Sequence, residues 1–146
     1  MPSDPWFEIC EQHAFTGSTS WRLKGGHIRY RGRDGRGEPH PAVQPVSAPK
    51  ERIESFIVTL DFLDAWSWRS DYDPTDCGYV TMDGMSWTLT GSIAGRSINA
   101  GGQNAYPSFA DASKSFMQHE RYAFLVFSFH RSFRIPFPAN AHELDS

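Results

Sequence analysis

Strict alternation of apolar and polar residues from Met85 to Ser92 constrains the fold more than any other feature of this chain. Met85, Trp87, Leu89 and Gly91 alternate with residues that carry hydroxyl groups. A period of two is typical of a β-strand that buries one face. The stretch therefore predicts a strand in a sheet with one face in the core.

Turn signals place more strands around this one. Asp83-Gly84 is a turn dipeptide, because glycine accepts a positive φ without steric cost, and it separates a short strand over 79–82 from the strand over 85–93. A turn at 94–96 then lets 97–100 pair back, which predicts an antiparallel meander. A second hairpin is predicted near the N-terminus, where Gly25-Gly26 separates alternating runs at 20–24 and 27–31.

Two helices are predicted, over about 48–64 and 108–126. The first has Pro49 in its first turn, where the missing N–H costs nothing, and one continuous apolar stripe made of Ile53, Phe56, Ile57, Leu60 and Leu63. The second begins after Pro107. Periodicity alone does not separate helix from strand over the apolar run 122–129. The triplet 66–68 has the alternation of a strand.

The order of these elements predicts an α+β fold, with an N-terminal hairpin and a central meander forming an antiparallel sheet that two helices cover on one face. A chain of 146 residues is expected to form a single domain over 1–146. Glycine and proline replace apolar periodicity over 33–46, which predicts a flexible loop. Residues 136–146 are expected to be an irregular tail.

Composition narrows the class of protein. Two cysteines are too few for a disulfide scaffold, and neither a signal peptide nor a membrane helix is recognisable, so a cytoplasmic protein without membrane contact is expected. A net charge of −3 provides no general attraction to nucleic acid or to an anionic membrane. No cofactor signature is present.

The combined pattern resembles a bacterial family of small α+β domains whose members share an Asp-Gly-x-x-Trp strand and a Gly-x-Asn-Ala-Tyr-Pro segment before the last helix. The resemblance covers about 47–125 and rests on the Trp-x-Trp triplet with Asp83, Gly84, Trp87, Asn104, Tyr106 and Pro107. It implies the fold and a bacterial or phage source, and it implies no activity. The 102–107 segment, which could also bind a ligand, is interpreted as a structural turn, because asparagine, glycine and proline shape turns.

The first candidate site is an acidic and aromatic run. Exposed aromatic side chains among carboxylates would form a docking surface for a basic protein partner, and this surface would contain Trp66, Trp68, Tyr72, Asp71, Asp73 and Asp76. The alternative is that the two tryptophans belong to the core and the aspartates lie in solvated loops.

The second candidate is a basic segment that would bind nucleic acid or a nucleotide through Arg29, Arg31, Arg33 and Arg36. The alternative is a solvated strand whose arginines prevent edge-to-edge aggregation. Because the segment is short and the chain is acidic, nucleic acid is the less favoured partner.

Catalytic and metal chemistry find little support. Cys10-x-x-His13 has the spacing of half a zinc site, but no second pair follows, and the aspartates at 71–76 lack the glycine and glutamate of an EF-hand loop. No catalytic or metal residue is therefore predicted. The expected function is a non-catalytic protein-binding module, similar to an immunity protein or an inhibitor, with nucleic-acid binding and a small enzyme as alternatives.

Overall fold

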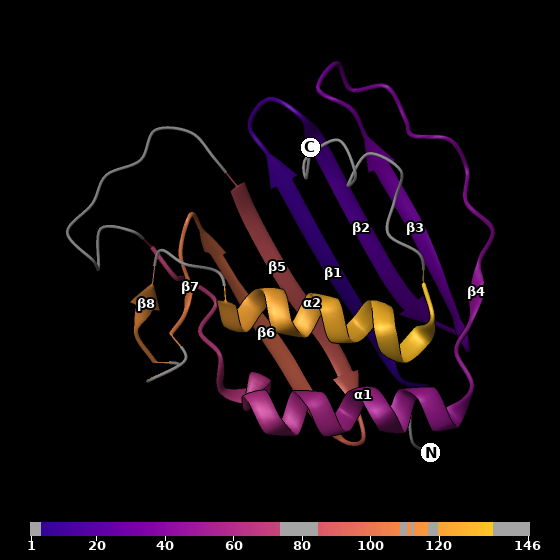
Figure 1. The fold of residues 1–146 in the computed structure, drawn as a ribbon, viewed down its shortest axis with the longest axis vertical. Helices are drawn as coiled ribbons and strands as arrows, with labels where there is room; N and C mark the ends of the chain where they lie inside the picture. The colour runs from indigo at the N-terminus through magenta and orange to yellow at the C-terminus, as the bar shows by residue number, and fades with distance from the viewer. Residues whose placement is uncertain (1–3, 74–84, 109–110, 112, 117–119, 136–146) are drawn as a thin grey trace.

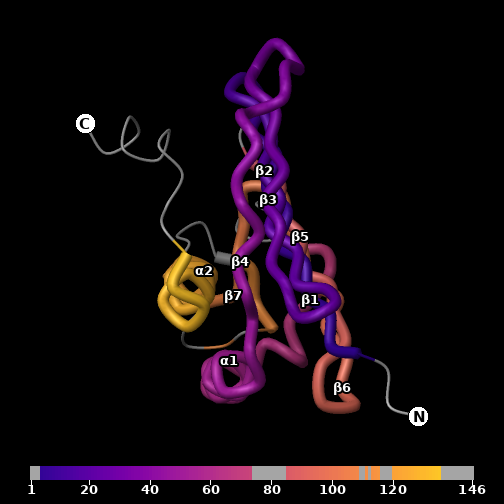
Figure 2. Tube along the Cα trace, turned by 90° about the vertical axis from the view of Figure 1, so that its right-hand side faces the viewer, coloured from indigo at the N-terminus to yellow at the C-terminus, as the bar shows by residue number. Residues whose placement is uncertain are grey.

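The computed structural model describes residues 4–73, 85–108, 111, 113–116 and 120–135. It contains a six-stranded sheet with the order β4-β3-β2-β1-β5-β6, in which every neighbouring pair is antiparallel. The strands are β1 (Trp6–His13), β2 (Gly17–Lys24), β3 (His27–Arg33), β4 (Val46–Ser47), β5 (Met85–Ile93) and β6 (Arg96–Gln103). The helices are α1 (Lys50–Leu63) and α2 (Glu120–Phe133), and both cover the same face of the sheet (Figures 1 and 2). The predicted α+β fold is confirmed.

Both predicted hairpins form with backbone geometry that the turn residues explain. Gly25 and Gly26 have φ values of 61° and 76°, and Ala94 and Gly95 have φ values of 55° and 75°. Two successive positive φ angles give the turn whose twist matches that of the flanking strands. The predicted turn at Asp83-Gly84 and the strand over 79–82 lie outside the described residues.

The strand β1 has no clear signature in the sequence. This strand lies in the middle of the sheet, between β2 and β5. Phe7 and Ile9 point into the core, but the same face continues with Glu11 and His13, so the apolar alternation ends after two residues. Contacts with other elements therefore stabilise this strand: β2 and β5 pair with it on both sides, and Glu11 accepts a hydrogen bond from Tyr122 of α2.

The second helix begins later than predicted. Tyr106 and Pro107 form β7 (Tyr106–Pro107), which pairs with β8 (Ser115–Phe116), so the helix follows β8, and its described part begins at Glu120. The Asp111 carboxylate accepts the backbone N–H of Ser113 at 3.0 Å, which stabilises a turn in place of a helical start. The ambiguous run 122–129 is helical.

The helix α2 ends at a backbone cap. Arg134 has a φ of 54°, and the N–H of Ile135 donates to the His130 carbonyl oxygen at 2.9 Å. This left-handed cap satisfies a terminal carbonyl group, and the buried Ile135 side chain adds an apolar contact.

The triplet 66–68 also differs from the prediction of an alternating strand. Ala65–Ser67 form a short 3-10 helix, η1, directly after α1. Asp64 adopts φ 50° and ψ 44° between the two helices, so the chain turns sharply there. The turn directs Trp68 into the core.

Aromatic rings fill the space between the helices and the sheet. Phe56 of α1 contacts Phe7 of β1 at a centroid distance of 5.2 Å and Phe129 of α2 at 5.4 Å. A second group surrounds Trp87, which stacks on Tyr72 and Tyr106. Together these rings join both helices to the sheet in one apolar core.

Candidate functional site

The face of the sheet opposite the helices is polar along every long strand. We call this surface the open face, because no described helix or strand lies over it (Figure 2). Its side chains follow from the alternation of each strand, since the residues between them point to the helix side of the sheet. In strand order they are Arg33, Arg31, Arg29 and His27; Ser18, Ser20, Arg22 and Lys24; Gln12, Cys10, Glu8 and Trp6; Ser86, Thr88, Thr90 and Ser92; and Gln103, Asn99 and Ser97.

Positive charge is concentrated on one side of the open face. β2 and β3 carry the residues that we call the basic stripe: Arg22, Lys24, Arg29, Arg31 and Arg33. On the described part of the three central strands of this face, Glu8 is the only carboxylate. The stripe is therefore strongly cationic although the whole chain is acidic, with a net charge of −3.

Carboxylates neutralise the basic stripe only in part, since Glu8 and Asp4 are the described carboxylates that border it. None of its five cations forms an ion pair with a described carboxylate. Arg22 and Arg29 face each other directly across β2 and β3. Like charges in that position oppose sheet formation, so this arrangement does not serve stability.

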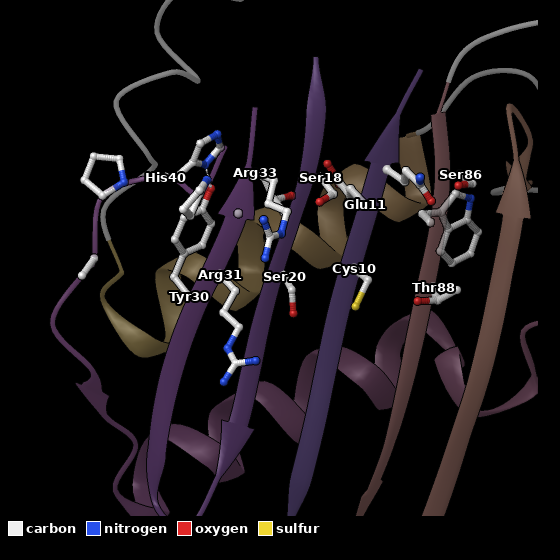
Figure 3. Close-up of a pocket in the computed structure, with 17 residues that line it drawn as sticks. Cys10, Glu11, Ser18, Ser20, Tyr30, Arg31, Arg33, His40, Ser86 and Thr88 are labelled. Atoms are coloured by element: carbon white, nitrogen blue, oxygen red, sulfur yellow. Dashed lines mark hydrogen bonds between the residues drawn. The ribbon is translucent and has the colours of Figure 1, made fainter. Parts of the chain in front are cut away.

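A hollow of about 600 Å³ lies on the upper part of the open face (Figure 3). Ser20, Cys10 and Thr88 form part of its floor, and Arg31 and Arg33 lie over β3. The segment 39–42 forms one side. In this segment, His40 Nδ1 and the Tyr30 hydroxyl form a 2.8 Å hydrogen bond, and the two rings stack. Tyr30 also packs on Trp21, so the Tyr30 and His40 rings lie at the edge of β3 on the helix side of the sheet.

A smaller hollow of about 190 Å³ adjoins the first. It is lined by Glu8, Ser20, Arg22, Lys24, Arg29 and Arg31. Four of these six side chains are cationic, so the small hollow is the most positive concavity among those described.

Cys10 has the wrong environment for a nucleophile. Burial raises the pKa of its thiol, and nearby Glu8 raises it further, so the thiolate is disfavoured. Cys77 lies outside the described residues. Among the described side chains, no three His, Cys, Asp or Glu residues are grouped as metal ligands would be.

Titratable groups under the helices connect elements of the fold. The Tyr122 hydroxyl of α2 donates to Glu11 Oε2 at 2.6 Å, and His13 Nε2 lies 3.3 Å from Glu11 Oε1. Burial and the Glu11 carboxylate raise the pKa of Tyr122 well above its usual value. This network lies on the helix side of the sheet and ties β1 to α2.

The predicted acidic and aromatic surface is largely not a surface. Trp68 and Tyr72 are only 4% and 1% exposed and pack against Trp87. Asp71 is exposed and pairs with Arg69, Asp73 is half-buried, and Asp76 lies outside the described residues. Two of the three predicted aromatic contacts are therefore inaccessible to a partner.

Trp66 is the accessible member of that group, but it too has partners. Its indole N–H donates to the Asp61 carboxylate at 2.8 Å, and the Arg96 guanidinium lies 4.2 Å from its ring centroid. Arg96 also pairs with Asp61 at 2.7 Å. The three side chains fasten η1 and α1 to the end of β6.

The Asn-Ala-Tyr-Pro segment has the structural role that was favoured for it. Asn104 has a φ of 50°, its N–H donates to the Met85 carbonyl oxygen at 2.8 Å, and its side-chain oxygen accepts the Met85 N–H at 2.9 Å. The Trp87 indole donates to the Ala105 carbonyl oxygen at 2.9 Å. Asp83 and Gly84 lie outside the described residues.

The predicted basic segment is only part of the cationic surface. Arg29, Arg31 and Arg33 belong to the basic stripe, whereas Arg36 lies in the turn after β3, where its N–H donates to Asp34. Arg22 and Lys24 were missed, because only strand pairing places them beside the arginines of β3. The signal available in the sequence was the Gly-Gly hairpin, whose register aligns these residues.

The chain matches no protein-family model and no curated protein. The resemblance to the small bacterial α+β domains therefore stays a prediction. In the described residues, neither helix has the length and apolar character needed to cross a membrane.

Proposed function

We propose that this chain is a non-catalytic protein-binding module whose open face receives an acidic surface of a partner protein. The observation that carries the proposal is the basic stripe, which is uncovered by any described element and unpaired with any described carboxylate. An acidic partner would supply the missing negative charge. Charge complementarity of this kind speeds association and selects the partner.

The arrangement of Arg22 and Arg29 supports a binding role. Their direct juxtaposition costs folding stability, and bound carboxylates would relieve the repulsion. At an interface we expect cations that lower the folding stability of the free protein and raise the stability of the complex. This feature also distinguishes the stripe from charges that merely solvate a strand.

A protein partner is favoured over nucleic acid by the shape and composition of the surface. From His27, which lies opposite Lys24, to Arg33 is six residues, or about 20 Å along the strand, so the stripe lacks the broad basic face that a nucleic-acid footprint normally involves. Single-stranded nucleic acid also stacks on exposed aromatic rings. On the described open face, Trp6 at one end is the single large aromatic residue.

The proposed surface replaces the one expected from the sequence, and it reverses the charge of the partner. A basic partner was expected at Trp66, Trp68 and Tyr72, but two of these residues are buried. The proposed role, binding another protein without chemistry, still matches that of an immunity protein or an inhibitor.

The experiment is affinity capture of partners from the native host with the wild type and two charge-matched variants. Arg29→Glu/Arg31→Glu reverses charge on the stripe, and Lys50→Glu/Arg131→Glu makes the same charge change on the helix side of the molecule. We expect a stoichiometric acidic protein to bind the wild type and the helix-side variant and to be lost from the stripe variant, with weaker capture at higher salt.

Two outcomes would contradict the proposal. A partner that binds the stripe variant as well as it binds the wild type would place the interface elsewhere. Capture of nuclease-sensitive nucleic acid, with no protein partner, would support the nucleic-acid alternative.

A further inference from the structure

The small hollow of the basic stripe has more positive charge than a carboxylate partner requires. Its lining contains Arg22 and Lys24 from β2 and Arg29 and Arg31 from β3, opposed by Glu8 alone. Four positive charges less one negative charge leave a formal charge of +3. A single carboxylate would neutralise only part of it.

The strand register explains why these side chains converge. Arg22 lies opposite Arg29, and Ser20 lies opposite Arg31, so guanidinium groups from two strands border the same concavity. Arginine presents several N–H donors in a planar fork that matches the oxygens of a phosphate group. A phosphate monoester carries nearly two negative charges at neutral pH and three acceptor oxygens.

Glu8 limits what the small hollow can accept. It lies on β1 beside Arg22, and its carboxylate accepts a hydrogen bond from Ser20 at 3.5 Å. The Glu8 carboxylate lowers the positive potential on the β1 side of the small hollow, so it would repel further phosphate groups there. This arrangement favours one phosphate group over a polyanion.

We infer that the small hollow is a subsite for a phosphate monoester carried by a phosphorylated side chain of the partner protein. The inference rests on the proposed function, since it specifies which acidic group the open face binds. The size is compatible: a hollow of about 190 Å³ has room for one phosphate group with its ester oxygen.

The test compares fluorescent peptides of one sequence that contain phosphoserine, glutamate or serine at a central position flanked by glycine and serine. Binding is measured by fluorescence anisotropy at constant ionic strength. We expect the phosphoserine peptide to bind at least about 10-fold more tightly than the glutamate peptide, because charge-assisted hydrogen bonds to a dianion are the stronger ones.

Three variants locate the binding. Arg29→Gln should weaken phosphoserine binding about 10-fold or more while the fold is retained, since it removes the repulsion with Arg22. Arg36→Gln, in the turn outside the small hollow, is the matched control and should have no such effect. Glu8→Gln should strengthen binding, because it removes the opposing carboxylate. Circular dichroism of each variant verifies folding.

The outcomes separate this inference from the proposed function. If the phosphoserine and glutamate peptides bind equally tightly, or if neither binds, the phosphate subsite is overturned. In that case, capture of the native acidic partner by the stripe would still support the protein-binding role. An oligonucleotide is a phosphate diester. If it binds as tightly as the phosphoserine peptide, the inference of a phosphate monoester subsite is also overturned. Loss of stripe-dependent capture alone would instead remove the proposed function.

Discussion

At the scale of single residues, Trp66 and Trp68 show how two neighbours of one type acquire different roles. The sharp turn at Asp64 places Trp68 against Trp87, with its indole N–H donating to the Leu63 carbonyl oxygen at 3.1 Å. Trp66 remains half-buried and interacts with the charged side chains of Asp61 and Arg96.

We therefore expect Trp68→Ala to destabilise the fold by about 3–5 kcal/mol, because it leaves a cavity in the core. Trp66→Ala should cost about 1 kcal/mol, since it removes a partly exposed ring and a cation–π contact. Urea denaturation measures both. Similar losses for the two variants would show that Trp66 contributes to the core as much as Trp68.

At the scale of elements, α2 carries a titratable group into the core. His130 is buried, contacts the Trp21 ring edge-on, and has its Nδ1 3.3 Å from the Ile135 carbonyl oxygen. Burial lowers the pKa of this imidazole, although the Ile135 carbonyl and the Glu11 carboxylate oppose the shift. Protonation is thus disfavoured in the folded state.

The sign of the pH dependence follows. Because the folded pKa lies below the unfolded value of 6.5, the contribution of His130 to stability is present above pH 6.5 and is lost as the pH falls through the folded pKa. His13 acts in the opposite direction, since the hydrogen bond to Glu11 raises its pKa, and its contribution is present below 6.5 and lost at higher pH.

We expect His130→Asn to lose less stability than the wild type between pH 7.5 and pH 5, measured by urea denaturation at each pH. Asparagine retains a hydrogen-bond donor and does not titrate. His27→Asn, at an exposed position on the open face, is the control and should follow the wild type. An unchanged pH slope in His130→Asn would assign the acid sensitivity to other groups.

At the scale of the whole molecule, one core joins both helices to the sheet. Phe56 contacts Phe7 of β1 and both Phe129 and Phe133 of α2. The chain should therefore unfold as one unit, as predicted for a single domain. Circular dichroism, which is dominated by the helices, and tryptophan fluorescence, to which Trp6, Trp21 and Trp87 of the sheet contribute, should give coincident urea transitions.

Phe56→Ala tests the same point, and we expect it to lower the unfolding free energy by about 3–5 kcal/mol with both transitions shifted together. Phe62→Ala, in the same helix but 72% exposed, should change it by about 0.5 kcal/mol or less. Transitions that separate in Phe56→Ala would indicate two units that unfold independently.

Local pattern was informative where a residue's neighbours in sequence also determine its environment. The apolar stripe that contains Phe56 predicted α1 to within a few residues, and the alternation from Met85 predicted β5. Both predictions succeed because a regular apolar period indicates one buried face. The turns at Gly25-Gly26 and Gly95 followed from the backbone freedom of glycine.

Long-range contacts decided the rest. The sequence by itself determined the α+β class, both hairpins and the first helix, because those features depend on local periodicity and turn chemistry. Only the tertiary structure decided that β1 lies at the sheet centre, that Trp68 and Tyr72 are core residues, and that Arg22 joins Arg29 in the basic stripe. These outcomes depend on strand pairing and on which face the helices cover, and no short stretch of sequence records either one.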